Sequence, residues 1–535
     1  DILSSNGVFA VASEGVTVAG CQFEATAIGV WLDKGCRDVT VVDCGFRLAK
    51  PGPNLPFTVA VLAREMRGAL TVEGNDIVQA LNGIIINDDV AGMPRSRGRA
   101  SRISDNRIEM LAFELADRRY GVDAAAASMQ VTGNSIRHVG GFVTGIRMCG
   151  SGSVATGNIV NSNAEISGAA LAIVVGHEDA GKFLPVERVI IGGNIVEGRQ
   201  HGIIIAGLAR GDISGNMLGR DGDGMGLGIV ANTATDTGIM GNHVYRSAIA
   251  IMMTDGARNA IRDNHVDSGN VGIAITKEAG SAISGNRLTG LRQFGIVVSS
   301  GTERCEIIEN RLTRCGAESD LAMAIAAIMV FGELHIESNE VMDTGIAPEA
   351  GGPVAARAIG ILGFLVLEAR VASNLVTYSN PALRLPANED RALLMLGMLD
   401  YEIALGAGRF VFGFPIQISD NKFIGTGAMA LVELVQIPIT DSIFIRFERV
   451  LFSGNYCSHI SPAFDDNIRA ATVSLVGRHS TVSGNQIKAA TPNFRSWHQH
   501  GMPGPFVGNA SHERSWDRPL GGGFPAPEQN FNTIA

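Results

Sequence analysis

The sequence of 535 residues predicts an all-β solenoid, a right-handed parallel β-helix with three short parallel strands in each coil. Three observations predict it: a recurring phrase around Asn, a second phrase that begins with Gly, and a regular distance between copies. From Asn194 to Asn310 successive Asn copies lie 22 to 26 residues apart. Self-similarity at such a period is typical of repeat proteins, whose cores grow along one direction.

In the first phrase an apolar residue, a spacer and a small or polar residue precede Asn, and an apolar residue follows, as in Val131–Ile136 (VTGNSI). Its Asn residues are at 75, 106, 134, 158, 194, 216, 242, 264, 286, 310, 339, 374, 421, 455 and 485. Cys21 and Cys44 take the same place upstream, so we expect about 17 coils. We expect each Asn to adopt the left-handed backbone of a tight turn. Its amide should bond to the next copy in an internal ladder.

The second phrase is Gly followed by alternating apolar residues, as in Gly202–Ile205 (GIII) and Gly272–Ile275 (GIAI). The apolar period is two and no helical period accompanies it. Each repeat therefore has one strand before Asn, one after Asn and one after this Gly. From about residue 7 to 490 the chain resembles the pectin-lyase-like β-helix superfold.

The two ends of the repeat differ in composition. Residues 1–490 are expected to form the β-helix, and the strand-like run at its start predicts a continuation from an upstream region. Residues 491–535 lack the repeat and contain Trp497, Phe506, Trp516, Phe524 and Phe531. We expect this segment to cap the last coil, because an open solenoid end exposes apolar core and unpaired backbone groups.

Charge and composition exclude several classes of protein. The net charge of −10 makes a nucleic-acid partner unexpected. No apolar run reaches the roughly 20 residues that cross a bilayer, so no membrane span is expected. No signal peptide is recognisable in the chain, and the functional interpretation below favours an extracellular or surface-associated location. No phosphate-binding loop or dinucleotide fingerprint occurs, so no cofactor is expected.

The resemblance implies an enzyme as one hypothesis, because many β-helix proteins cleave or epimerise acidic polysaccharides. Asp88, His177 and Asp255 lie in fragments similar to hydrolase motifs of that fold. Strand counting places successive members three coils apart, about 14 Å, whereas inverting hydrolases hold their carboxyl groups about 6.5–9.5 Å apart. A lyase would need a base such as Lys277 beside Glu278, with Asp255 on the preceding coil. A surface ion pair is the simpler interpretation.

An exposed row is predicted at the position after each ladder Asn. On four consecutive coils this row carries His243, His265, Arg287 and Arg311, a pattern that suits an extended anionic polysaccharide. Acidic residues in the preceding position would partly neutralise the row, which makes a solvated mixed-charge face the alternative. His498, His500 and His512 are candidates for a metal site, and packing within the cap is the alternative.

Two classes of function therefore remain. The first is a non-catalytic β-helix that serves as a structural, adhesive or polymer-binding module of a larger bacterial or phage surface assembly, with further domains as partners. The alternative is a polysaccharide lyase or glycosidase that uses the groove beside the Gly-initiated strand. We favour the first, because the sequence indicates no compact acid–base cluster.

Overall fold

The computed structural model contains strands and turns, and no helix, among the residues it describes. These residues are 6–49, 57–87, 101–111, 119–138, 142–162, 170–179, 182–219, 224–319, 321–346, 355, 357–378, 391–398, 415–425, 431–436, 449–460, 471–476, 479–488, 497–500, 503–511 and 533–534. They belong to two compact units, Asp1–His265 and Val266–Ala535. Within the described ranges, a membrane-spanning helix is not found.

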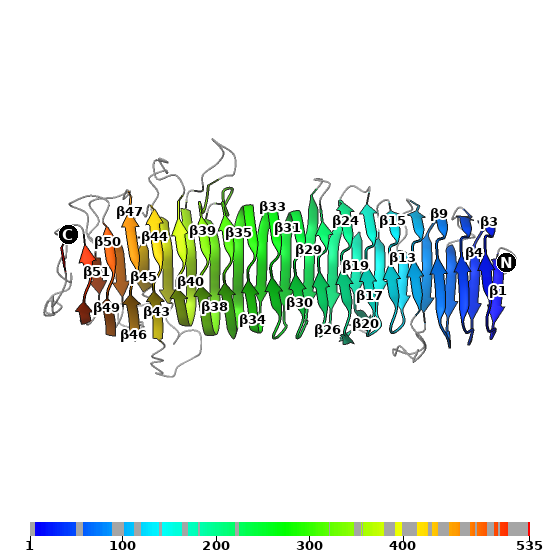
Figure 1. Ribbon diagram of the computed structural model, residues 1–535, viewed down its shortest axis with the longest axis horizontal. Helices are drawn as coiled ribbons and strands as arrows, with labels where there is room; N and C mark the ends of the chain where they lie inside the picture. The colour runs from blue at the N-terminus through cyan, green and yellow to red at the C-terminus, as the bar shows by residue number, and fades with distance from the viewer. Residues whose placement is uncertain are drawn as a thin grey trace. The chain divides into compact units, whose positions relative to one another are not determined.

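Each coil of the first unit, drawn from blue to green in Figure 1, adds one strand to each of three parallel sheets. We name them the Gly sheet, the pre-Asn sheet and the post-Asn sheet. The Gly sheet contains β1 (Asn6–Val11), β4 (Ile28–Asp33), β7 (Val59–Arg64), β10 (Asn82–Asn87), β13 (Arg119–Ala125), β16 (Val143–Met148), β19 (Leu171–Val175), β25 (His201–Ala206), β29 (Met225–Asn232) and the second half of β31 (His243–Thr254).

The other two sheets of the first unit flank the ladder Asn residues. The pre-Asn sheet contains β2 (Thr17–Ala19), β5 (Val39–Val42), β8 (Leu70–Glu73), β11 (Arg102–Ser104), β14 (Gln130–Thr132), β17 (Val154–Thr156), β23 (Ile190–Gly192), β27 (Asp212–Ser214), β30 (Gly238–Met240) and β32 (Ala260–Arg262). The post-Asn sheet contains β3 (Gln22–Thr26), β6 (Gly45–Leu48), β9 (Asp76–Ala80), β12 (Arg107–Met110), β15 (Ser135–His138), β18 (Ile159–Ser162), β24 (Ile195–Gly198), β28 (Met217–Leu218) and the first half of β31.

Two short strand pairs lie outside this pattern. The strands β20 (His177–Asp179) and β21 (Lys182–Leu184) form an antiparallel pair. The strands β22 (Val186–Glu187) and β26 (Leu208–Ala209) pair in parallel. The strand β33 (His265–Thr276) begins at the last residue of the first unit.

The second unit repeats the three sheets. Its Gly sheet contains the second half of β35 (Arg287–Thr302), the first halves of β38 (Leu321–Glu337) and β40 (Arg357–Ala372), β42 (Arg391–Met398), β45 (Val432–Gln436), β48 (Val473–Val476) and β51 (Trp497–His500). Its pre-Asn sheet contains β34 (Ala279–Ser284), β36 (Arg304–Ile308), the ends of β38 and β40, β43 (Pro415–Ser419), β46 (Arg449–Ser453), β49 (His479–Ser483) and β52 (Pro503–Val507).

The post-Asn sheet of the second unit contains the start of β35, β37 (Arg311–Thr313), β39 (Glu340–Met342), β41 (Leu375–Thr377), β44 (Lys422–Gly425), β47 (Tyr456–His459), β50 (Gln486–Lys488) and β53 (Ala510–Ser511), which pairs with β54 (Thr533–Ile534). Each unit is therefore an all-β solenoid with three parallel strands per coil. This confirms the predicted parallel β-helix.

The core of each coil is filled by alternate apolar side chains. Ile146, Ile173 and Ile203 occupy one register position on three consecutive strands and are fully buried. Gly145 and Gly202 precede two of them, and Ala172 precedes the third. At the two glycines the backbone of the neighbouring coil lies too close for a side chain. A Cβ on Gly145 would lie 2.6 Å from the carbonyl oxygen of Ala172, closer than any non-bonded carbon can approach. The Gly of this phrase therefore lies where the next coil leaves no room for a Cβ.

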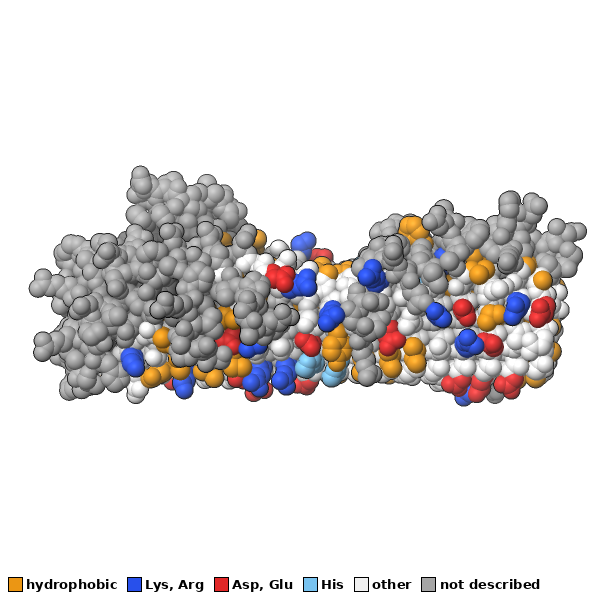
Figure 2. Space-filling view, turned by 90° about the horizontal axis from the view of Figure 1, so that it is seen from above, with side chains coloured by type: hydrophobic (Ala, Val, Ile, Leu, Met, Phe, Trp, Pro, Cys, Tyr) orange, Lys and Arg blue, Asp and Glu red, His pale blue; other side chains and the backbone are white. Residues whose placement is uncertain are grey.

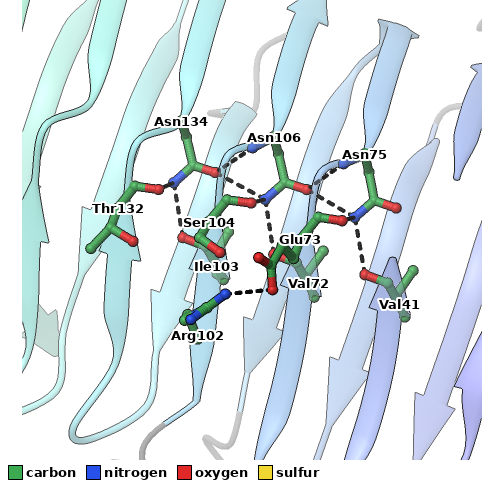
Figure 3. Close-up of polar contacts among 10 residues, drawn as sticks. All are labelled: Val41, Val72, Glu73, Asn75, Arg102, Ile103, Ser104, Asn106, Thr132 and Asn134. Atoms are coloured by element: carbon green, nitrogen blue, oxygen red, sulfur yellow. Dashed lines mark hydrogen bonds and ion pairs between the residues drawn. The ribbon is translucent and has the colours of Figure 1, made fainter. Parts of the chain in front are cut away.

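The ladder of Asn amides is present in both units. Asn75 Nδ2 donates to Asn106 Oδ1 at 2.9 Å, and Asn106 Nδ2 repeats the contact with Asn134 Oδ1 at 2.9 Å (Figure 3). The backbone N–H of each Asn donates to the same oxygen, and its Nδ2 also donates to a carbonyl of the preceding coil. Each buried amide is thus satisfied within the ladder, which keeps the cost of burying it low.

The predicted ladder members are connected within each unit, and the ladder runs one position further than the sequence pattern indicated. Asn216 bonds to Asn242, and Asn242 to Asn264, in the first unit. Asn286 bonds to Asn310 in the second. Asn485 bonds to Asn509, which the sequence analysis did not include because its surroundings, Val507-Gly508-Asn509-Ala510, lack the second apolar residue of the phrase.

One expectation about the turn is wrong. The left-handed backbone lies at the residue before each ladder Asn and not at Asn itself: φ is +65° at Gly74, +57° at Asp105 and +66° at Gly133. The reason is that Asn must direct its side chain inward while its own N–H bonds to the next coil. The reversal of the chain therefore falls one residue earlier, where Gly is favoured.

The ladder begins differently at its N-terminal end. The backbone N–H of Cys44 donates to Asn75 Oδ1 at 3.0 Å, so Cys44 takes the predicted ladder place. Cys44 is buried, Cys21 is half-buried, and both are free thiols. At the other end, β51 to β53 add strands to all three sheets, while the rest of residues 491–535 lies mostly outside the described part. The capping role of that segment stays a prediction.

Candidate functional site

The Gly sheet of the first unit carries one row of side chains that alternate with the core positions. In chain order the row is Phe9, Trp31, Leu62, Ile85, Asp123, Arg147, Val174, Ile204, Val230 and Met252. Eight members are apolar, and the two charged members are neighbours on β13 and β16. Asp123 and Arg147 are therefore the two polar residues of this row, and they lie next to each other.

The two charged side chains form a tight, two-pronged ion pair. Arg147 Nε donates to Asp123 Oδ1 at 2.7 Å, and Arg147 Nη2 donates to Asp123 Oδ2 at 2.6 Å. The guanidinium carbon lies 4.4 Å from the centre of the Tyr120 ring. The Asp123 side chain is 4% exposed and that of Arg147 is 24% exposed. The carboxylate is enclosed, while part of the guanidinium reaches solvent.

The pair keeps the guanidinium charged. Burial by itself would lower the pKa of Arg147, but the hydrogen bonds and the negative charge of Asp123 outweigh burial and raise the pKa. A guanidinium has five N–H donors, and Asp123 accepts two of them. The others can bind carboxylate or hydroxyl oxygens of a ligand. Arg147 is thus suited to binding and unsuited to accepting a proton.

The strand that carries Tyr120 and Asp123 is held by polar contacts at its start. The Tyr120 backbone N–H donates to Asn82 Oδ1 at 3.0 Å, which joins β13 to β10. The buried Arg119 donates from Nη1 to the carbonyl oxygen of Leu111 at 2.7 Å. These contacts fix the position of β13. The Tyr120 ring is therefore already in place against the Arg147 guanidinium.

A buried histidine lies at the end of β15, in the same part of the first unit. His138 is fully buried, and its Nε2 lies 2.9 Å from Gln200 Oε1. Burial lowers the pKa of His138 to about 4; the Gln200 hydrogen bond opposes this shift and the charge of Arg119 adds to it. His138 is therefore neutral at neutral pH and acts as a packing residue of this corner.

The hydrolase-like fragments are separated along the first unit. Asp88 lies outside the described residues, directly after β10. His177 begins β20 and follows β19, which is three strand pairings from β10. Asp255 follows β31, three further pairings along. The strand order thus agrees with the coil counting, and the absence of joint catalysis stays a prediction.

The lyase candidates take different positions. Asp255 belongs to the first unit and Lys277 to the second; both are exposed and have left-handed backbones, with φ of +55° and +53°. These are turn positions. Glu278 is 1% exposed, and its Oε2 accepts a hydrogen bond from Ser281 Oγ at 2.8 Å. Glu278 is therefore enclosed at the start of the second unit, whereas Lys277 reaches solvent.

The predicted binding row is divided between the units. His243 and His265 stack in the first unit, with ring centres 5.4 Å apart and planes 11° from parallel. Arg287 and Arg311 are register neighbours in the second unit, where Arg311 Nε lies 3.2 Å from Glu340 Oε2. Figure 2 also shows acidic and basic side chains interspersed over the described surface of this view. These contacts are compatible with both the binding row and the mixed-charge face.

The histidine-rich segment is described only in part. His498 and His500 lie in β51, beside Ser474 and Val476 of β48, and His512 lies outside the described residues. Among the described residues, no group of three or more His, Cys, Asp or Glu side chains that could hold a metal ion is found.

The sequence analysis missed Tyr120, Asp123 and Arg147. A signal was present, because Asp123 and Arg147 each stand two residues after the Gly of the second phrase, in Gly121-Val-Asp-Ala and Gly145-Ile-Arg-Met. At that place the other coils of the first unit carry apolar residues. Opposite charges there on consecutive coils would have predicted a pair across neighbouring strands.

Comparison with known proteins gives matches of low identity. The family model "Periplasmic copper-binding protein (NosD)" matches residues 155–315. No curated protein matches. The Dettilon tailspike protein is similar with a TM-score of 0.36 and 12% identity, over 64% of this chain and 61% of that chain. The chain thus spans less than two thirds of that tailspike chain.

Two polysaccharide lyases are also similar. A mannuronic acid specific family 6 lyase from human gut microbiota has a TM-score of 0.30 and 14% identity, over 77% of this chain and 85% of that chain. An Arg-to-Ala mutant of the family 6 alginate lyase AlyGC has a TM-score of 0.20 and 11% identity, over 99% and 97% of the two chains.

Proposed function

We propose that the protein is a polymer-binding β-helix module of a larger surface assembly, and that it holds an acidic polysaccharide on the Gly sheet of its first unit. The observation that carries this proposal is the Asp123–Arg147 pair in an otherwise apolar row, with the Tyr120 ring packed against the guanidinium. A polar anchor between apolar neighbours is the usual composition of a ligand site, where a few polar groups fix orientation. Neighbouring strands lie about 4.8 Å apart, close to the length of one sugar unit, so successive sugars can contact successive coils.

The cluster supports binding better than proton transfer. Arg147 stays protonated because Asp123 raises its pKa, and both oxygens of Asp123 already accept an Arg147 N–H. The partly exposed guanidinium can donate to a sugar carboxylate or hydroxyl. The half-buried Val174 and Ile204, next along the row, offer apolar contact to the ring faces.

The test is binding of the full chain to alginate and to polygalacturonate, with neutral dextran as the comparison, measured by titration calorimetry. Arg147→Lys keeps the charge beside Asp123 but removes the planar fork, so affinity for the acidic polymers should fall about tenfold or more. Arg258→Lys is the matched control, because Arg258 makes the same two-pronged pair with Asp236 on an exposed turn. Equal loss in both variants, or no binding by the unaltered chain, would refute the site.

A lyase is the second candidate, favoured by the phenol of Tyr120 beside the Arg147 guanidinium. In that reaction the deprotonated Tyr120 would accept the proton next to the sugar carboxylate, and Arg147 would stabilise the enolate that forms. The enolate would then collapse to the carbon–carbon double bond of the unsaturated product as the glycosidic carbon–oxygen bond breaks. The leaving oxygen would take the proton from Tyr120, which restores the phenolate. The same polymers are incubated with the protein, and the ultraviolet absorbance of the unsaturated product is followed. Turnover that Tyr120→Phe abolishes would establish the lyase, and binding without turnover would support the non-catalytic module.

A further inference from the structure

Two cysteines occupy neighbouring ladder positions at which the following coils carry Asn. Cys21 and Cys44 come directly before β3 and β6, whose first residues, Gln22 and Gly45, are register partners. The backbone N–H of Gly45 donates to the carbonyl oxygen of Cys21 at 2.9 Å. Both cysteines are free thiols. The two thiols therefore lie on adjacent coils at the same position of the repeat.

The thiols are directed as the ladder amides are. Cys44 Sγ lies 3.6 Å from the carbonyl oxygen of Val18, on the preceding coil, and 3.3 Å from that of Val42. Asn75 directs its Nδ2 to the two corresponding carbonyl oxygens of its own surroundings. Cys21 Sγ lies 3.4 Å from the carbonyl oxygen two residues before it. Both sulfur atoms thus face the place where an amide hydrogen bond joins the later coils.

We infer that Cys21 and Cys44 are a redox-active dithiol that closes to a disulfide and ties their two coils together. The inference is independent of the polysaccharide-binding function proposed above. Register neighbours on parallel strands have Cα atoms about 4.8 Å apart, within the roughly 4.4–6.8 Å that a disulfide spans. Their Cβ atoms begin at about the same separation and must approach to about 3.5–4.5 Å. Closure therefore needs a backbone movement of less than about an ångström.

The two thiols differ in their access to solvent, which sets the order of reaction. Cys21 is half-buried, whereas Cys44 is 2% exposed. Burial raises the pKa of the Cys44 thiol, and contacts with Cys21 have smaller effects in both directions. Because the thiolate is the reactive form, an external oxidant reacts first at Cys21.

The oxidant is a low-molecular-weight disulfide such as glutathione disulfide. The Cys21 thiolate attacks one of its sulfur atoms and releases the first glutathione thiolate. The Cys44 thiolate then attacks the Cys21 sulfur and releases the second. Each protein thiol loses one proton, and each glutathione thiolate takes one. The dithiol is thus oxidised by two electrons, and glutathione disulfide is reduced to two molecules of glutathione.

The experiment incubates the reduced full chain with glutathione disulfide, blocks the remaining thiols with N-ethylmaleimide under denaturing conditions, and digests the product with trypsin. Cleavage places the three cysteines of this region in three different peptides, which end at Lys34, Arg37 and Arg47. Mass spectrometry should find the Cys21 and Cys44 peptides linked, with the loss of two hydrogen atoms. Dithiothreitol should separate them again.

The matched control is Cys36→Ser, because Cys36 is a buried thiol of the same region whose Sγ lies 3.4 Å from the carbonyl oxygen of Ala10. It should leave the yield of the link unchanged, whereas Cys21→Ser and Cys44→Ser should each abolish the link. Unlinked thiols at both positions, glutathione retained on Cys21 without a link, or an equal yield of links to Cys36 would overturn the inference.

A second readout uses the unaltered protein and does not depend on how the variants fold. The disulfide restricts the opened chain between β3 and β6, so oxidation should slow amide hydrogen exchange in both strands about tenfold or more. Reduction with dithiothreitol should restore the original rate. Equal exchange rates in the oxidised and reduced protein would equally refute a disulfide that ties the two coils.

Discussion

The Gly sheets of the two units have the same parallel strand arrangement. They differ in the side chains that face away from the interior of the coil. In the second unit Met323, Ala326, Ile359 and Leu362 pack as one apolar cluster. In the first unit a similar cluster around Ile28 and Leu62 gives way to the Asp123–Arg147 pair. The inward residues of both are the same alternating Ile, Val and Leu. The difference shows that packing within the coil restricts the residue types of the inward-facing positions only. The outward-facing positions can therefore carry residues for a specific function.

The largest effect should come from breaking the charged pair. Arg147→Met leaves the enclosed Asp123 carboxylate without its main counter-charge, so the free energy of unfolding should fall by about 3–5 kcal/mol. The double variant Asp123→Leu with Arg147→Met makes the row apolar, as it is at Ala326, Leu362 and Met395 of the second unit, and should regain most of this loss. Urea unfolding at neutral pH measures both. A double variant no more stable than the single one would contradict the comparison.

Acid should weaken the first unit through His138. Its pKa in the folded protein is about 4, below the value of 6.5 expected when unfolded, so the folded state binds fewer protons between these values. The stabilisation is complete above about pH 6.5 and is lost as pH falls toward 4, by up to about 3 kcal/mol. Urea unfolding across this range should be less pH-dependent in His138→Gln. The exposed His243→Gln is the control, and an unchanged pH dependence in His138→Gln would count against the buried neutral histidine.

The ladder should contribute equally in both units. Asn242→Leu in the first unit and Asn455→Leu in the second each leave neighbouring amide groups unpaired, so each should lower the unfolding free energy by about 1–3 kcal/mol. Arg304→Leu, which removes an exposed contact to Glu306, is the matched surface control and should cost less than about 0.5 kcal/mol. A loss confined to one unit would show that the ladder is not the element they share.

The smallest effect concerns thiol reactivity. Burial raises the pKa of Cys305 to about 12, with a smaller contribution from nearby carboxylates, and burial raises that of Cys315 to about 12. Because the thiolate is the reactive form, both should resist alkylation in the folded protein. The half-buried Cys21 and Cys149 of the first unit should react much faster. Mass spectrometry of timed iodoacetamide reactions measures this, and equal rates would be inconsistent with the enclosed core.

The candidate site illustrates what a repeat pattern predicts and what it leaves open. The sequence shows that Asp123 and Arg147 occupy equivalent positions of two repeats, because each stands two residues after the Gly of the second phrase. That they form a pair required the register of β13 against β16, and that Tyr120 lies under the guanidinium required the side-chain packing. The expectation of left-handed Asn failed for a similar reason, since the phrase marks the turn but not which residue bears it.

The sequence by itself determined the inner half of this protein: the coil period, the Asn ladder and the Gly close to the next coil. These follow from local rules, because a buried amide must be bonded and a close backbone approach must lack a side chain. Only the tertiary structure decided which outer residues meet, as with Glu433 and Ser474, which lie in one row although a long segment separates them in the chain. The loops between strands vary in length, so spacing along the sequence does not report adjacency across coils.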